Sequence, residues 1–334
     1  MAFFSQNMLE LAVEIASHDP SYDDLAAKFM DHVIWISRAV SHVGADGLWD
    51  EEDGFFYDVL RFPDGSATRL KVRSIVGLLP LCATSLTEPW DRQQVPSVMK
   101  LFEERTRRMP EVLSNIFMGR RGHADRGIMA LVTPERLRRV LAYMLDENEF
   151  LGAHGIRALS RCHLEHPYVI NVEGREYKVK YVPGDSDSGM FGGNSNWRGP
   201  IWMPMNVLLI RALLHLYLYY GDSIEVECPT GSGHQMNLYE VAREISQRLV
   251  GIFLRDANGR RPVYGAVETF QTDPHWRDHL IFPEYFHGDT GAAVGASHQT
   301  GWTGLVAMLI QLFGSLDATQ VLDGGKKSLF FKNP

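Results

Sequence analysis

Residues 194–202 read NSNWRGPIW, and an apolar run, MPMNVLLIRALLHLYLYY, follows them to Tyr220. A run this long and this apolar is typical of a buried helix, with Pro200 near its first turn. The preceding polar, glycine-rich segment predicts a loop that leads into the helix. We therefore expect a buried helix over 200–220, against which other segments of the chain pack.

The remaining sequence predicts helices in pairs, separated by long loops and few strands. Apolar periodicity predicts further helices over 4–18, 21–43, 75–83, 95–107, 238–254 and 301–316, and another that starts at Thr133-Pro134-Glu135. Two strands, 55–62 and 67–72, flank the turn signal Pro63-Asp64-Gly65 and predict a β-hairpin. The class is mainly α, and both helical solenoids and helical toroids fit this order.

The two ends of the chain raise separate expectations. Phe4, Met8, Leu11 and Ile15 have the spacing of one helix face, but no capping residue precedes them. This suggests a chain cut from something longer, in which apolar sides of the end helices are left exposed and self-associate or dock to an upstream domain. Residues 323–334 are expected to form a frayed tail after a domain over 1–322.

Composition excludes several classes of protein. The formal net charge is −8 without a basic cluster, so nucleic acid is not an expected partner. No apolar run is long enough to span a bilayer, and the N-terminus lacks a signal peptide, so a soluble, cytoplasmic protein is expected. Cys82, Cys162 and Cys228 are widely spaced and odd in number, which favours free thiols over a disulfide framework.

The loop 194–202 is the first candidate site. Its Trp197 and Trp202 could stack on the apolar faces of sugar rings, and Arg198 could donate fixed hydrogen bonds to sugar hydroxyls. The alternative is a capped, buried helix start with tryptophans that only pack. Composition alone leaves these two interpretations equally open.

The second candidate site is the segment 282–302, in which Glu284 stands between Pro283 and the aromatic Tyr285. Burial among aromatic side chains tunes a carboxylate for general-base work. The alternative is a turn carboxylate that caps nearby backbone amides. Asp289 is a rival base, but its Gly-Asp-Thr-Gly turn favours bonds to its own backbone, and Glu268 is a weaker rival.

The third candidate site, residues 49–58, has four acidic residues in a row and then aromatics. Paired carboxylates could do acid–base work or hold a cation, but a solvated turn before a hairpin is favoured. His275 and His279 are four residues apart, yet Pro274 and Pro283 place them in a loop, so no metal site is expected. The sequence has no phosphate-binding or dinucleotide-binding motif, and no cofactor is expected.

Three segments together resemble glycoside hydrolase family 63, which includes processing α-glucosidases and mannosylglycerate hydrolases. They are residues 196–202, residues 283–302 with Pro283-Glu284-Tyr285 and Trp302, and residues 49–58. The resemblance implies an (α/α)6 toroid and inverting hydrolysis of an α-glucoside or α-mannoside, with Glu284 as the general base. It implies that an oligosaccharide or small glucoside contacts the side chains of Trp197, Arg198, Trp202, Tyr285, His287, Trp302, Trp49 and Phe55.

One departure limits what the resemblance implies. The family's general acid lies in a Gly-x-Asp-Asn segment, and no Asp-Asn pair occurs here. We therefore expect the C-terminal part of an incomplete toroid with a small β-hairpin insertion, and an acid supplied from upstream. Two other functions stay open: a non-catalytic carbohydrate-binding or scaffold remnant of such an enzyme, and a helical protein-interaction solenoid.

Overall fold

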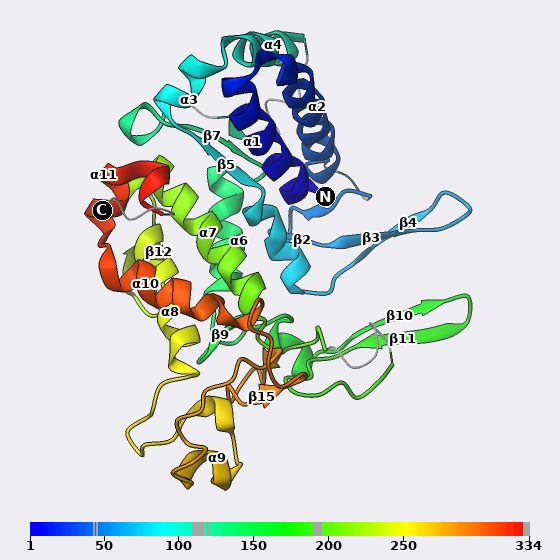
Figure 1. Ribbon diagram of the computed structural model, residues 1–334. Helices are drawn as coiled ribbons and strands as arrows, with labels where there is room; N and C mark the ends of the chain where they lie inside the picture. The colour runs from blue at the N-terminus through cyan, green and yellow to red at the C-terminus, as the bar shows by residue number, and fades with distance from the viewer. Residues whose placement is uncertain (43, 45, 109–116, 119–120, 190–195, 330–334) are drawn as a thin grey trace.

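The computed structural model describes the chain apart from residues 43, 45, 109–116, 119–120, 190–195 and 330–334 (Figure 1). Its fold is mainly helical, as predicted. The α-helices of the described residues are α1 Ala2–His18, α2 Asp23–Val40, α3 Pro89–Gln94, α4 Pro96–Arg108, α6 Pro134–Met144, α7 Met203–Tyr220, α8 Leu238–Gly251, α9 Glu268–Thr272, α10 Val306–Ser315 and α11 Ala318–Ser328.

Strands are short and pair mostly as two-stranded hairpins, with β5, β7 and β6 in one three-stranded sheet. Every named pair is antiparallel. They are β1 Trp49–Asp50, β2 Phe55–Phe56, β3 Asp58–Arg61, β4 Ala67–Leu70, β5 Thr84–Thr87, β6 Phe117–Met118, β7 Gly127–Ala130, β8 Leu151–Gly152, β9 Gly155–Ile156, β10 Tyr168–Val172, β11 Arg175–Val179, β12 Glu225–Glu227, β13 Gln235–Asn237, β14 Tyr285–Phe286 and β15 Ala293–Val294.

Helix α7 lies at the centre of the main core, as its apolar sequence predicts. It packs against α8, α11, β5 and the 3-10 helix η2, Ile75–Cys82. The helix begins at Met203 and not at Pro200, because residue 201 has extended backbone that bonds to another segment. Ile201 N donates to Phe286 O at 2.8 Å, and Phe286 N donates to Ile201 O at 3.0 Å. This bridge brings the two main candidate loops side by side.

Helices α1 and α2 form the predicted helical hairpin, joined by the short 3-10 helix η1, Pro20–Tyr22. With α4 they enclose a second, smaller apolar core at the top of the molecule (Figure 1). The side of α1 that faces inward is made of small or polar residues and one leucine. They are Ser5, Gln6, Leu9, Ala12 and Ala16.

Two predictions about individual elements need correction. Residues 75–82 form a 3-10 helix and not an α-helix, and Pro80 within it has no N–H to donate. The stretch 323–328 is not a frayed tail, because α11 extends to Ser328 with a kink at Gly325, whose φ is +64°. Lys326 N donates to Glu88 Oε1 at 2.8 Å, and Glu88 is itself buried in an ion pair with Arg126 at 3.0 Å.

Other predicted elements are confirmed. Thr133 caps α6 by accepting a hydrogen bond from Arg136 N, and the turn at 63–65 joins β3 and β4. The β3–β4 and β10–β11 hairpins project from the same side of the molecule in Figure 1. A closed or open toroid remains a prediction. None of the helices in the described ranges combines the length and apolarity needed to cross a membrane.

Candidate functional site

Glu284 is held at the end of a short antiparallel ladder. It directly precedes β14, which pairs with β15. Glu284 N donates to Ala296 O at 2.9 Å, and Ala296 N donates back to the Glu284 carboxylate at 3.0 Å. Gly295, with φ of +77°, lies so close that a Cβ there would be 2.7 Å from Glu284 Oε2. The carboxylate is half-buried, and only a glycine at position 295 leaves room for it against this backbone.

Four aromatic side chains pack together and are here called the aromatic stack, and one of them, Tyr285, directly follows Glu284 in the chain. The rings of Trp197 and Trp202 are stacked with centroids 4.2 Å apart, and those of Trp202 and Tyr285 are stacked at 4.6 Å. Trp302 meets Trp202 edge-on at 6.2 Å. Trp202 and Tyr285 are buried, whereas Trp302 is 37% exposed and Trp197 is half-buried. The structure thus brings together residues that are about a hundred positions apart in the sequence.

Arg198 is buried beside the stack, where its guanidinium holds a loop in place. It donates to Asp187 Oδ1 at 2.9 Å and to the hydroxyls of Ser188 and Ser186 at 3.1 and 2.6 Å. Lys180 pairs with the same aspartate at 2.6 Å, and its hydrogen bond, followed by the Arg198 charge, holds the pKa of Asp187 below its ordinary value. Arg198 therefore orders residues 186–188 in this structure.

His287 and Asp289, next along the chain, are also engaged. His287 Nδ1 accepts from the backbone N–H groups of Asp289 and Thr290 at 3.2 and 3.4 Å, which places the ring proton of the neutral imidazole on Nε2. Asp289 does not bond its own backbone as its turn suggested. Instead it accepts from Tyr181 Oη at 2.9 Å and from Arg157 at 3.3 Å.

The weaker rival Glu268 lies away from these loops, on the exposed helix α9. It forms an ion pair with Arg260 at 2.7 Å, and this hydrogen bond lowers its pKa. Asp289 is engaged by Tyr181 and Arg157. Among the three carboxylates proposed as bases, Glu284 is the one that is followed directly by a member of the aromatic stack, Tyr285.

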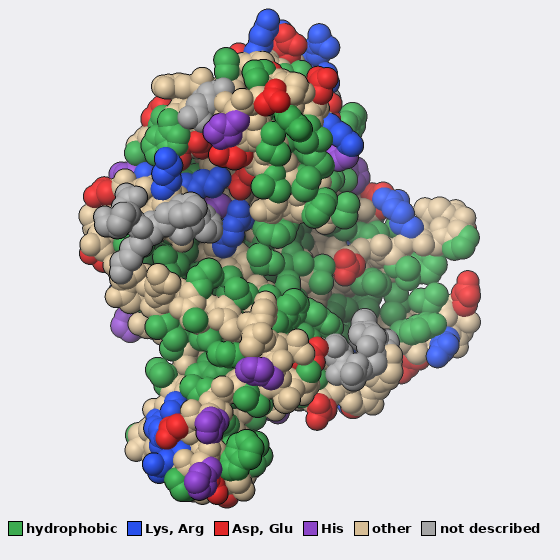
Figure 2. Space-filling view, viewed as in Figure 1, with side chains coloured by type: hydrophobic (Ala, Val, Ile, Leu, Met, Phe, Trp, Pro, Cys, Tyr) green, Lys and Arg blue, Asp and Glu red, His purple; other side chains and the backbone are tan. Residues whose placement is uncertain are grey.

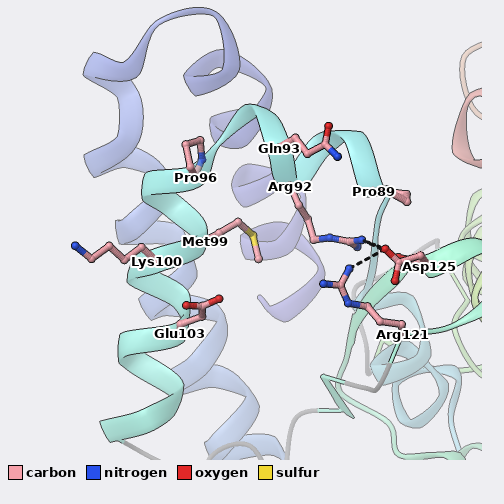
Figure 3. Close-up of a pocket in the computed structure, with 9 residues that line it drawn as sticks. All are labelled: Pro89, Arg92, Gln93, Pro96, Met99, Lys100, Glu103, Arg121 and Asp125. Carbon is pink, nitrogen blue, oxygen red and sulfur yellow. Dashed lines mark hydrogen bonds and ion pairs between the residues drawn. The ribbon is translucent and has the colours of Figure 1, made fainter.

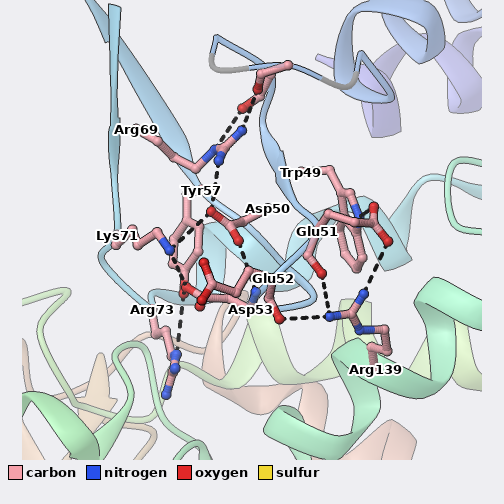
Figure 4. A network of polar contacts seen from close by, with 12 residues as sticks. Trp49, Asp50, Glu51, Glu52, Asp53, Tyr57, Arg69, Lys71, Arg73 and Arg139 are labelled. Atoms are coloured by element: carbon pink, nitrogen blue, oxygen red, sulfur yellow. Dashed lines mark hydrogen bonds and ion pairs between the residues drawn. The ribbon is translucent and has the colours of Figure 1, made fainter.

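The third candidate segment forms a network of ion pairs (Figure 4). Asp50 is buried and bonds Arg69 at 2.8 Å and Lys71 at 3.2 Å, and Lys71 also reaches Asp53 at 3.2 Å. Burial opposes ionisation of Asp50, but the Asp53 backbone N–H and Lys71 keep its pKa below the ordinary value. Arg69, Lys71 and Arg73 alternate along the chain, a period-two signal of a shared face that the sequence analysis missed.

Trp49 and Phe55, the weaker sugar-contact candidates, lie in the core with exposures of 1% and 0%. Trp49 donates to Glu51 at 2.6 Å and packs on Phe56, while Phe55 packs on Phe150. Neither ring presents a face to solvent. The segment 49–58 is thus a structural turn, and its aromatics serve packing.

A separate pocket lies between α3, α4 and the turn near residue 123 (Figure 3). Arg92 and Arg121 both point to Asp125, at 2.8 and 3.1 Å. Its lining contains no aromatic side chain and none of the predicted site residues: Pro89, Arg92, Gln93, Pro96, Met99, Lys100, Glu103, Arg121 and Asp125. This pocket is not the candidate sugar site. No group of three His, Cys, Asp or Glu side chains in the described ranges could hold a metal ion.

Two proteins are similar to the chain. It is 46% identical over 331 residues to the uncharacterized protein YMR196W of Saccharomyces cerevisiae, a match over 94% of the chain and 30% of that protein. It is 28% identical over 175 residues to a probable mannosyl-oligosaccharide glucosidase of Schizosaccharomyces pombe, a match over 52% of the chain and 15% of that protein. This similarity supports a relation to glycoside hydrolases.

The chain spans less than a third of the length of the budding-yeast relative and less than a sixth of that of the fission-yeast relative. No protein-family model matches it. The similarity therefore supports the broad class of enzyme and does not extend to the reaction or the substrate.

Proposed function

We propose that this chain supplies the general-base side of an inverting glycoside hydrolase that acts on an α-glucoside or α-mannoside, with Glu284 as the base. The observation that carries the proposal is that Glu284, which is fixed by backbone hydrogen bonds, directly precedes Tyr285 of the aromatic stack. The partial similarity to a probable glucosidase supports the same class of reaction.

The proposed reaction needs two carboxyl groups on opposite sides of the bond. Glu284 takes a proton from a water molecule as the water oxygen attacks the anomeric carbon. The bond to the leaving oxygen breaks, and a general acid gives that oxygen its proton. In inverting enzymes the two carboxyl groups stand about 6.5–9.5 Å apart. The acid is proposed to come from a segment of the full protein outside these residues.

The aromatic stack suits a sugar ring next to such a base. Trp197 and Trp302 are its partly exposed members, so they are the proposed platforms, with Trp202 and Tyr285 as the buried support behind them. Arg198 acts indirectly in this proposal, because it orders residues 186–188 through Asp187. His287, whose Nε2 carries the proton, is the proposed donor to a sugar hydroxyl.

The first test measures binding, which does not need the acid. Glucose and mannose disaccharides are titrated into the purified chain while tryptophan fluorescence and heat are recorded. We expect saturable binding that Trp302→Ala weakens and that Trp276→Ala, which removes another exposed tryptophan just after α9, leaves unchanged. Absence of saturable binding, or equal loss in both variants, would exclude a sugar site here.

The second test measures hydrolysis in a protein of the length of the budding-yeast relative. A glutamine in place of the residue that corresponds to Glu284 is expected to abolish hydrolysis while sugar binding persists. Sugar binding without hydrolysis in the unsubstituted protein would instead favour the non-catalytic carbohydrate-binding alternative.

A further inference from the structure

Helix α1 carries its large apolar side chains on the outside. Phe4, Leu11 and Ile15 are 59%, 56% and 41% exposed, while small and polar residues such as Ser5 and Ala12 are buried. Trp35 on α2 is also 55% exposed, and hydrophobic side chains gather over α1 and α2 in Figure 2. Side chains that would stabilise a core by burial are thus left in water, which is typical of an interaction surface.

The spacing of these residues indicates what kind of surface covers them. Together with the half-buried Met8, they follow the intervals four, three and four from Phe4 to Ile15, which is the seam of a helix that packs lengthwise on another helix. The pattern is also symmetric about the point between Leu9 and Glu10. If an identical helix lies antiparallel across that point, Phe4 faces Ile15 and Met8 faces Leu11.

We propose that α1 is the centre of a two-fold interface with a second copy of this chain, in which the two α1 helices pack antiparallel and each α2 flanks the pair. Antiparallel pairing also sets Glu14 of each copy near the N-terminal end of the facing helix, where the helix dipole favours a carboxylate. The same surface then serves both copies, as a two-fold interface requires.

The size of the surface indicates how tightly the two copies are expected to bind each other. A 17-residue helix is about 25 Å long, so the α1–α2 face offers an area at the low end of specific interfaces. Interfaces of that size are typical of weak or transient pairs. We expect a dimer that forms reversibly in the micromolar concentration range.

The first experiment is sedimentation velocity of the purified chain over a range of concentrations. The expected result is a monomer–dimer equilibrium that Leu11→Glu weakens at least tenfold. Val169→Glu, a change at a similarly exposed position on β10, is the matched control and should leave dimerisation unchanged. Circular dichroism and thermal unfolding show that each variant folds. A chain that stays monomeric, or a dimer insensitive to Leu11→Glu, overturns the proposal.

The second experiment tests the register with cysteine pairs. When a Phe4→Cys chain is mixed with an Ile15→Cys chain and oxidised, a disulfide-linked heterodimer should form, because these positions face each other. Each variant alone should cross-link poorly, because its two cysteines would lie about 16 Å apart along the helix axis, beyond the reach of a disulfide. Efficient cross-linking of Phe4→Cys with itself would exclude the antiparallel arrangement.

Discussion

Glu284 differs from the other two candidate bases, Asp289 and Glu268, in its place in the fold. Asp289 is held by Tyr181 and Arg157, and Glu268 by Arg260. Glu284 has a backbone N–H on one oxygen and lies next to Tyr285 of the aromatic stack. Its place directly before Tyr285 is the reason why we propose this carboxylate as the base.

The first residue-scale prediction concerns Glu284→Gln. In the complete enzyme the amide keeps the shape of the side chain but cannot accept the proton from water, so kcat should fall about 10²- to 10⁴-fold while KM changes little. The measurement is steady-state hydrolysis. Asp289→Asn is the comparison, and it should act mainly on stability because it weakens the bonds to Tyr181 and Arg157. A larger loss of kcat in Asp289→Asn would reverse the assignment.

A second residue-scale prediction concerns Arg198→Lys. Lysine keeps the charge but cannot donate in several fixed directions at once, as the guanidinium does to Asp187, Ser186 and Ser188. We expect a loss of about 1–3 kcal/mol in the free energy of unfolding, because buried polar groups lose partners. Hydrogen exchange of residues 186–188 should rise in the same variant. Unchanged exchange there would show that Arg198 does not order the loop.

His215 on α7 gives the third prediction, which concerns pH. It is fully buried, and burial lowers its pKa from 6.5 to about 3. Because the folded pKa is depressed, the unfolded chain binds a proton first as pH falls below 6.5, and stability is lost between that pH and about 3. From pH 7 to pH 5 this single group should remove about 2 kcal/mol from the free energy of unfolding.

The measurement is urea unfolding at pH 7 and pH 5, compared with the variant His215→Asn. The variant should be less stable at pH 7 but should show a smaller loss on acidification. Burial also lowers the pKa of His154 and His163, so part of the slope should persist in the variant. An identical loss in both proteins would mean that His215 is not the group that titrates.

At the scale of elements, one buried ion pair joins segments far apart in the chain. Glu88, at the start of α3, forms an ion pair with Arg126 at 3.0 Å and accepts a hydrogen bond from the Lys326 backbone N–H of α11. Arg126 in turn donates a hydrogen bond to Leu218 O of α7. Both charged side chains are almost fully buried. If one charge is removed, the other stays buried without its partner.

We therefore predict that Glu88→Gln lowers the free energy of unfolding by about 3–5 kcal/mol. Hydrogen exchange should also accelerate in α11, because a neutral amide binds the Lys326 backbone and Arg126 less strongly than the carboxylate does. Glu268→Gln, which breaks an exposed pair, is the control and should leave the unfolding midpoint unchanged. Protection of α11 that survives Glu88→Gln would show that apolar packing alone holds this helix.

Elements with local signals could be predicted from the sequence. Thr133 with Pro134 marks the start of α6, and Pro63-Asp64-Gly65 marks the β3–β4 turn, because caps and turns depend on a few adjacent residues. The start of α7 could not be predicted. Ile201 is held extended by Phe286, 85 positions later, and no local signal reports that bond.

For the candidate site, the sequence points to the loops but not to how their side chains pack. The sequence predicts Trp197, Trp202 and Glu284 in one site, and in the structure Trp197 stacks on Trp202, which stacks on Tyr285, the residue after Glu284. The sequence does not distinguish exposed rings from buried ones, because an aromatic residue in a polar loop has the same kind of neighbours in the sequence in both cases. Trp49 and Phe55 were candidates for that reason, and tertiary packing decided their burial.

For the whole molecule, the bond between Glu88 and the Lys326 backbone has a consequence for synthesis on the ribosome. These residues are 238 positions apart. At ordinary translation rates of 5–20 residues per second, roughly 10–50 s pass between their appearance. During that interval Glu88 can already pair with Arg126, which is made 38 positions after it, but it lacks the hydrogen bond from the Lys326 backbone. Helix α11 is thus the last segment to join this buried ion pair, and chaperone binding to the surface that α11 covers should be strongest before the helix emerges.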